Sequence, residues 1–142
     1  MPTLNDRLAG YEPHFMAVVG ALRAANLTVG EGWGRDNAAN DLTPPYVTVE
    51  STSTPRRAGP VGRPFDDSRL EFQTRCVARS ARAAEVLRDR VAVVMYGGIT
   101  VPDRRVWVTS DLSVGVFRDP DVHELFDGVD RWTLWTTPDE GS

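Results

Sequence analysis

The clearest pattern in the chain is a strict alternation of small or apolar residues with polar ones over residues 69–78. Successive side chains of a β-strand point to opposite faces, so this alternation predicts a strand with one packed face and one wet face. The packed face is expected to carry Leu70, Phe72, Thr74, Cys76 and Ala78. The wet face is expected to carry Arg69, Glu71, Gln73 and Arg75.

Two other stretches repeat apolar residues every three or four positions, which is the spacing of an amphipathic helix. Pro13 is expected to start the first helix, Ser80 to cap the second, and Gly97-Gly98 to end the second. In residues 13–26 the apolar stripe is Phe15, Val18, Val19, Leu22 and Ala25. After Ser80 the stripe is Ala84, Leu87, Val91, Val94 and Met95, and the residues expected to face outward are Arg82, Glu85, Arg88 and Asp89.

The rest of the chain divides into β-rich segments and segments rich in turn-forming residues. The predicted strands are residues 45–50, 104–109, 112–117 and 131–137, with Ser110-Asp111 between the middle two. The predicted irregular segments are the loop 30–44 with a short strand around Trp33, the long exposed loop 53–67, the short helical turn or ordered loop 118–130, and the loose tail 138–142. This order predicts one α+β domain over residues 1–142, with an antiparallel or mixed sheet of four to five strands and two main helices packed on one face.

Composition narrows the functional classes. The chain has 142 residues and a net charge of −4, and its 16 basic residues are all Arg. Free nucleic acid is an unexpected main partner for a domain in which acids outnumber bases. The absence of Lys fits either codon bias in a GC-rich genome or a preference for arginine in polar subunit interfaces. A single cysteine, no apolar leader and no long apolar run predict a protein folded in a cytoplasm, with no disulfide and no membrane span.

Candidate catalytic and ligand-binding residues are few. His14, in the first turn of the predicted helix, is expected to be a surface or partly packed residue, and Cys76 is expected to act as a small hydrophobe. Asp119, Asp121 and His123 are spaced so that they could offer ligands to a cation, but Asp-Pro-Asp is also ordinary turn chemistry. The four tryptophans are expected in the sheet or in a subunit interface, rather than in a ligand-stacking cage. We therefore expect no catalytic, cofactor or metal site.

The basic stretch of the loop 53–67 is the feature of the sequence that has the least evident role in a monomeric protein. It carries Arg56, Arg57 and Arg63 among Gly and Pro. Three readings stay open from the residues alone. The stretch is a solvated hairpin tip, an arm ordered against a neighbouring subunit, or a contact for the phosphates of passing DNA.

The order of the predicted elements and several residue runs resemble those of a known protein family. A leading helix is followed by Pro45-Tyr46-Val47-Thr48-Val49, then by a loop with Pro and Gly, and then by the strand-to-helix run FQTRCVARS over residues 72–80. The helix continues as AAEVLRDRV over residues 83–91. These features resemble the tail terminator proteins of long-tailed, non-contractile bacteriophages (siphophages), especially those of actinobacterial hosts. The resemblance covers about residues 13–137, and residues 120–130 have no counterpart in it.

What this resemblance implies is a virion structural protein without enzymatic activity or cofactor. The family forms a ring, expected to be hexameric, that caps the tail tube at its head-proximal end, stops tube growth and joins the tail to the head. The implied partners are further copies of the chain, the major tail tube protein, the head-tail connector proteins and, in passing, the genomic DNA in the lumen. Assembly is expected in the host cytoplasm, away from any membrane.

The interface residues expected for such a ring come from the basic loop and the wet face of the predicted strand 69–78. They are Arg56, Arg57, Arg63, Phe65, Arg69, Glu71, Gln73 and Arg75. Three alternatives stay open: a head-tail connector or neck adaptor protein, a small metal-dependent hydrolase using Asp119, Asp121 and His123, and a nucleic-acid-binding domain using Arg56, Arg57 and Arg63.

Overall fold

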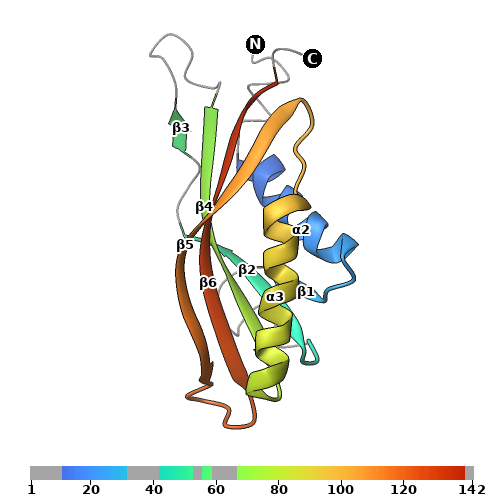
Figure 1. Ribbon diagram of the computed structural model, residues 1–142, viewed down its shortest axis with the longest axis vertical. Helices are drawn as coiled ribbons and strands as arrows, with labels where there is room; N and C mark the ends of the chain where they lie inside the picture. The colour runs from blue at the N-terminus through green and yellow to red at the C-terminus, as the bar shows by residue number, and fades with distance from the viewer. Residues whose placement is uncertain (1–10, 32–41, 53–55, 59–66, 140–142) are drawn as a thin grey trace.

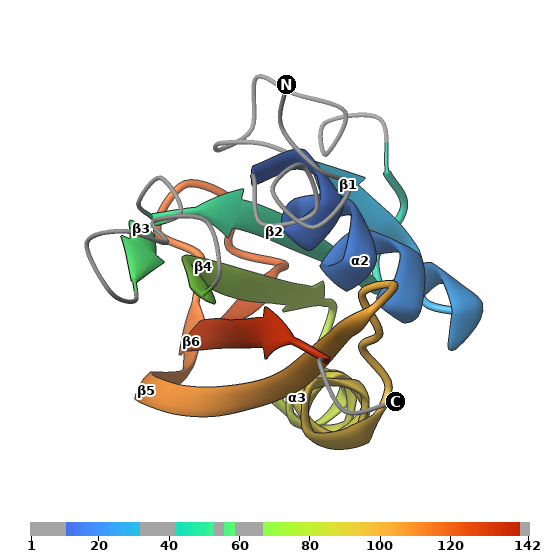
Figure 2. The same cartoon turned by 90° about the horizontal axis from the view of Figure 1, so that it is seen from above.

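The computed structural model describes residues 11–31, 42–52, 56–58 and 67–139 and forms a sheet with two helices on one face (Figures 1 and 2). The elements are α2 (Tyr11–Ala24), β1 (Val29–Glu31), β2 (Tyr46–Ser51), β3 (Arg56–Ala58), β4 (Asp67–Ala78), α3 (Ala81–Gly97), β5 (Arg104–Arg118) and β6 (Phe126–Pro138). The predicted α+β class, with a mixed sheet and two main helices covering one side, is confirmed.

The strands form one sheet in the order β1-β2-β4-β6-β5. β1 pairs in parallel with β2, and all other pairs are antiparallel. β6 occupies one side of β4 along nearly its whole length, while β2 and the short β3 lie one after the other along the other side. β5 is therefore an edge strand, or border, along one side of the sheet (Figure 1). On the opposite side the border is β3 at one end of the molecule and β1 at the other.

The central strand β4 confirms the alternation read from the sequence. Leu70, Phe72, Thr74, Cys76 and Ala78 are all buried on the face toward the helices. The helix stripes pack against this face: Phe15, Val18, Val19 and Leu22 from α2, and Ala84, Leu87, Val91, Val94 and Met95 from α3. The core thus lies in a single layer between the sheet and the two helices.

The ends of α3 are also where the sequence places them. The Ser80 hydroxyl accepts a hydrogen bond from the backbone N–H of Ala83 at 3.1 Å, which satisfies one donor that the first turn leaves free. The helix ends at Gly97, and Gly98 donates its backbone N–H to the Val94 carbonyl at 2.7 Å. The helix α2 begins at Tyr11, two residues before Pro13, so Pro13 lies in its first turn.

Residues 104–118 form one strand, where the sequence suggested two strands around a turn at Ser110-Asp111. β6 is long enough to pair with all of β5, so the chain stays extended and absorbs extra residues as bulges at Asp111 and Val114. The Asp111 carboxylate accepts hydrogen bonds from the hydroxyls of Thr109 and Thr133, which holds the first bulge in place. Gly115, with φ of 87°, supplies the left-handed backbone that the second bulge needs.

Three predicted irregular segments contain strand. Val29–Glu31 is the strand β1, so the predicted loop 30–44 begins with paired residues, while Trp33 lies outside the described residues. Within the predicted loop 53–67, Arg56–Ala58 forms the strand β3, which pairs with Asp67–Arg69 of β4. Only Asp119–Leu125 of the segment 118–130 is irregular, because Phe126 already begins β6. Sequence periodicity missed these strands since each is short or lacks alternation.

Arg88 contradicts the expectation that it faces water. Its guanidinium points at the sheet, where Nε and Nη2 donate to the two carboxylate oxygens of Asp130 at 3.0 and 2.8 Å, and Nη2 also donates to the Ser113 hydroxyl. Its remaining nitrogen, Nη1, meets the exposed Glu85 at 3.1 Å. This bidentate pair joins α3 to β6 and β5 from a position that helical periodicity assigns to the surface.

The Arg88 and Asp130 pair is expected to carry a large share of the contact between α3 and the sheet. Asp130→Asn should lower the free energy of unfolding by about 3 kcal/mol, because it leaves a mostly buried guanidinium without its counter-charge. Glu85→Gln is the matched control, since Glu85 is exposed and its loss should cost less than about 1 kcal/mol. Urea unfolding of the three proteins measures both values. Equal losses in the two variants would contradict the prediction.

The same pair makes stability depend on pH. Burial alone would raise the pKa of Asp130, but the hydrogen bonds from Arg88 and Ser113 and the charge of Arg88 lower it below its ordinary value. The stabilisation is therefore present above the pKa of an unfolded aspartate, about 3.9, and is lost as the pH falls through the lowered native pKa. The difference in unfolding free energy between wild type and Asp130→Asn should be constant from pH 7 to about pH 5 and shrink below pH 4. A difference that grows on acidification would contradict this.

Candidate interaction surface

Five of the residues predicted for a subunit interface occupy register positions on the face of the sheet opposite the helices, while Arg57 falls in a row of the other face. Arg69, Glu71, Gln73 and Arg75 all lie on β4 on the face opposite the helices. Arg56 and Arg57 belong to β3, where Arg56 is in register with Arg69. Arg63 and Phe65 lie outside the described residues. The structure thus brings four of the predicted residues onto one strand face and two more onto the strand beside it.

Half of this face is occupied by contacts within the chain. Gln73, predicted to be wet, is buried and donates its side-chain amide to Glu50 at 3.1 Å. Arg75 donates to the buried Asp127 at 3.1 Å. These contacts hold β2, β4 and β6 together, and they correct the prediction for Gln73. Alternation along one strand does not show which polar side chains will meet polar partners across the sheet.

The free part of the face lies at the other end of β4, around two tryptophans. The indoles of Trp107 on β5 and Trp135 on β6 are stacked with 6.3 Å between centroids and 5° between planes. The guanidinium of Arg69 lies 5.4 Å from the centroid of the Trp135 ring, within cation–π range, and Glu71 lies 3.7 Å from Arg69. Trp107 is 46% exposed. Arg56, Arg69, Trp135 and Trp107 thus occupy one register row across four strands, which we call the arginine–tryptophan row.

The border strand β5 carries several of the exposed apolar side chains. Trp107, Leu112, Val114 and Phe117 are all exposed along it. Beside Trp107, a hollow of about 220 Å³ lies between the end of α3 and β5, lined by Tyr96, Ile99 and Val106 among others. Apolar and aromatic side chains gathered at a sheet border are typical of a surface that another protein covers.

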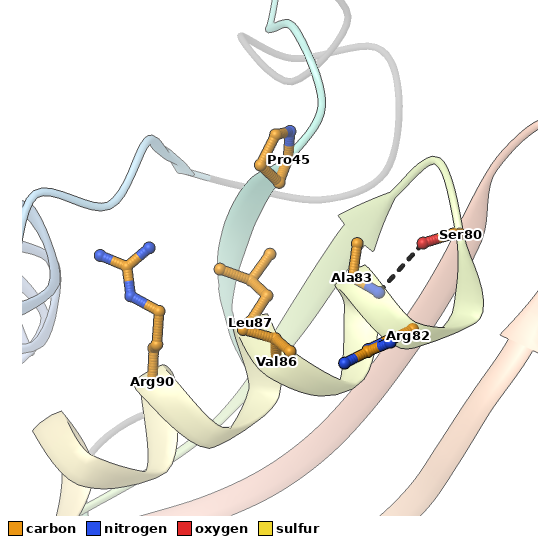
Figure 3. A pocket seen from close by; sticks show the side chains of 7 residues that line it. All are labelled: Pro45, Ser80, Arg82, Ala83, Val86, Leu87 and Arg90. Carbon is orange, nitrogen blue, oxygen red and sulfur yellow. Dashed lines mark hydrogen bonds between the residues drawn. The ribbon is translucent and has the colours of Figure 1, made fainter.

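A second surface is an open groove of about 370 Å³ between the N-terminal half of α3 and the start of β2 (Figure 3). Ala83, Val86 and Leu87 form its apolar floor, with Arg82 and Arg90 at its sides. The seven lining residues include no carboxylate, imidazole or thiol, and the Ser80 hydroxyl is engaged in the helix cap. The groove can bind an apolar or acidic segment, but its lining offers no group for proton transfer at neutral pH.

The residues weighed for chemistry have structural partners. His14 is fully buried, against the expectation of a surface or partly packed residue, and its Nε2 lies 2.6 Å from the Thr136 hydroxyl oxygen. The Thr136 hydroxyl also accepts a hydrogen bond from Arg104 Nε at 2.9 Å. The spacing of residues along a helix does not predict a polar contact of this kind, because the partners come from distant strands. Burial, with a smaller contribution from the charge of Asp130, raises the pKa of the Cys76 thiol to about 12, which suits a buried hydrophobe.

The Asp119 side chain stabilises the turn in which it lies. Its carboxylate accepts the backbone N–H groups of Asp121 and Val122 at 2.8 and 3.1 Å, while Asp121 and His123 are exposed. This is the turn chemistry weighed against the cation site. Within the part of the chain that the structure describes, no three His, Cys, Asp or Glu side chains are close enough together to hold a metal ion.

Comparisons with known proteins add no family. Neither protein-family models nor curated proteins match this chain. Over the described residues, the structure contains no helix that is both long and apolar enough to span a membrane.

Trp132 and Trp107 should differ in their contribution to stability when each is replaced by alanine. Trp132 is buried, and its indole N–H donates to Thr74 at 3.0 Å. Trp132→Ala should therefore lower the free energy of unfolding by about 3–5 kcal/mol. Trp107→Ala removes a half-exposed ring and should cost about 1 kcal/mol. Chemical denaturation measures both, and a similar loss at the two positions would contradict the assignment of Trp107 to a surface role.

Proposed function

We propose that this protein is a structural subunit that assembles with copies of itself, and that its role is that of a siphophage tail terminator. The observation that carries the assembly part is the arginine–tryptophan row, which ends in an exposed indole on the border strand β5. Tryptophan and arginine dominate the binding energy of many protein interfaces. Together with the exposed apolar side chains of β5, the row supports a surface made to be covered by protein.

The architecture suits a ring subunit. A cyclic ring uses two different surfaces of each subunit, one against each neighbour. Here the sheet offers two different borders at one end of the molecule, β3 on one side and β5 on the other (Figure 1). The groove on α3 lies on the helical side of the sheet, apart from the borders β3 and β5, so it stays available for a further protein chain, such as another copy, the tail tube or a connector.

The assignment to a tail terminator, rather than to another assembling protein, rests on the resemblance of residues 13–137 to that family. A head-tail connector or neck adaptor would use the same kinds of surface, and the two roles differ in which protein the ring binds. For the hydrolase alternative, Asp119 is engaged by its own turn, and no observation favours the reaction. The nucleic-acid alternative differs from both in predicting affinity for duplex DNA.

The proposal predicts a ring. Light scattering and negative-stain imaging of the full chain, alone and with the major tail tube protein, should show rings of about six subunits, free or at tube ends, and shorter tubes when the protein is added. Persistence of a monomer under both conditions would overturn the proposal. A ring that binds connector proteins but leaves tube growth unchanged would replace the terminator role with that of an adaptor. Duplex affinity that is high at low salt and falls steeply as salt rises would favour the nucleic-acid alternative.

A further inference from the structure

We infer that the groove on α3 binds the β5–β6 loop, residues 119–125, of the next copy of this chain. This inference rests on the proposed function, because it names a contact by which the copies assemble. The two surfaces carry opposite charge. The groove has Arg82 and Arg90 at its sides and no carboxylate among its seven lining residues. The β5–β6 loop contains three acidic residues and no arginine.

The groove combines an apolar floor with a cation on either side. Arg82, Val86 and Arg90 follow one another at intervals of four residues, so they form one line along the surface of α3 (Figure 3). Val86, in the middle of this line, is 53% exposed. The acidic residues of the same half of the helix do not line the groove, and one of them, Glu85, is paired with Arg88. A segment that fits this surface has apolar residues between carboxylates.

The β5–β6 loop has this pattern. Asp121 and Glu124 are both exposed, and Val122, which lies between them in the sequence, is partly exposed. Pro120, just before them, is exposed as well. The loop thus offers carboxylates for the two arginines of the groove and apolar side chains for its floor.

Hydrogen bonds within the loop hold it in one shape. Besides the bonds that the Asp119 carboxylate accepts, the Asp119 N–H donates to the Leu125 carbonyl at 2.9 Å, and the Leu125 N–H donates to the Val122 carbonyl at 3.0 Å. Arg118, at the end of β5, donates to the His123 carbonyl at 3.2 Å. A loop that is already ordered loses little conformational entropy when it binds, which favours its use as a contact.

The loop and the groove lie at the same end of the molecule. Tyr46, next to the groove residue Pro45, pairs with Val77, and the following residue Ala78 pairs with Phe126, next to the loop. The β5–β6 connection and the N-terminal end of α3 accordingly lie at one end (Figure 1). In the sheet, β4 separates β2 from the hairpin of β6 and β5, so the groove and the loop are two different surfaces. A ring needs two different surfaces at one level, because rotation about its axis keeps each surface at its own height.

Reversing the charges on each side tests the contact. The loop variant carries Asp121→Arg and Glu124→Arg, and the groove variant carries Arg82→Glu and Arg90→Glu. Each variant alone should weaken self-association at least about tenfold, as measured by light scattering against protein concentration, because like charges then face each other. All four substitutions in one chain restore opposite charges and should recover assembly.

Mixing the loop variant with the groove variant gives a second result. In an equimolar mixture, each loop meets a groove of opposite charge only on a chain of the other variant. Rings should therefore reappear and contain the two variants in equal numbers, which native mass spectrometry measures. A ring of six subunits permits this alternation because six is an even number.

The controls address charge and folding. Arg82→Glu alone should weaken assembly, whereas Arg131→Glu makes the same charge change on the face of the sheet opposite the helices, where Arg131 is exposed, and should assemble like wild type. Circular dichroism melts confirm that each variant folds, as expected for substitutions at exposed positions. Arg90 donates to the Ala25 carbonyl at 3.2 Å, so Arg82→Glu and the loop variant carry the test if the groove variant unfolds early.

The outcomes separate this inference from the proposed function. If wild type forms rings and the folded variants form them equally well, or if neither the mixture nor the fourfold variant recovers, this contact is wrong and the ring proposal stands. If the groove variant keeps its rings but loses binding to the tail tube or connector proteins, the groove receives that protein and this contact is wrong. If wild type assembles neither alone nor on tubes, both fail.

Discussion

The structure depends on the burial of one face of β4 while its other face stays polar. Five alternate side chains of this strand are buried against α2 and α3, and β4 is paired along both of its sides. A strand that is central in the sheet and covered on one face fixes the register of everything around it, because a shift by one residue would exchange the two faces. The helices, the polar face and the two sheet borders all take their positions from this strand.

Polar contacts then divide the opposite face into two functional halves. Toward one end, Gln73 donates to Glu50 and Arg75 donates to Asp127, so these four side chains from three strands make their contacts within the chain. Toward the other end, Arg69 faces an aromatic ring and Glu71 remains partly exposed. The same strand therefore stabilises the fold with one half of its polar face and leaves the other half, around Arg69 and Glu71, partly exposed.

Arginine is suited to both tasks. The Arg88 guanidinium reaches from α3 into the sheet and satisfies Asp130 with two parallel hydrogen bonds, which a lysine ammonium could not match in geometry. At the sheet surface, the planar guanidinium of Arg69 lies over an indole. Whatever the origin of the exclusive use of arginine, the structure uses its planar shape both in a mostly buried ion pair and in an exposed stack.

The amino-acid sequence by itself determined the two main helices, the cap of α3 and the packed face of β4, since these follow from local periodicity and from residues that act within one turn or strand. Tertiary structure decided whatever depends on a partner distant in the chain. Arg88 turns inward because Asp130 lies opposite it, and His14 is buried because Thr136 meets it across the core. β5 continues through Ser110-Asp111 because β6 is long enough to pair with both halves. The arginine–tryptophan row was likewise out of reach, because its members come from four strands and only the sheet register places them side by side.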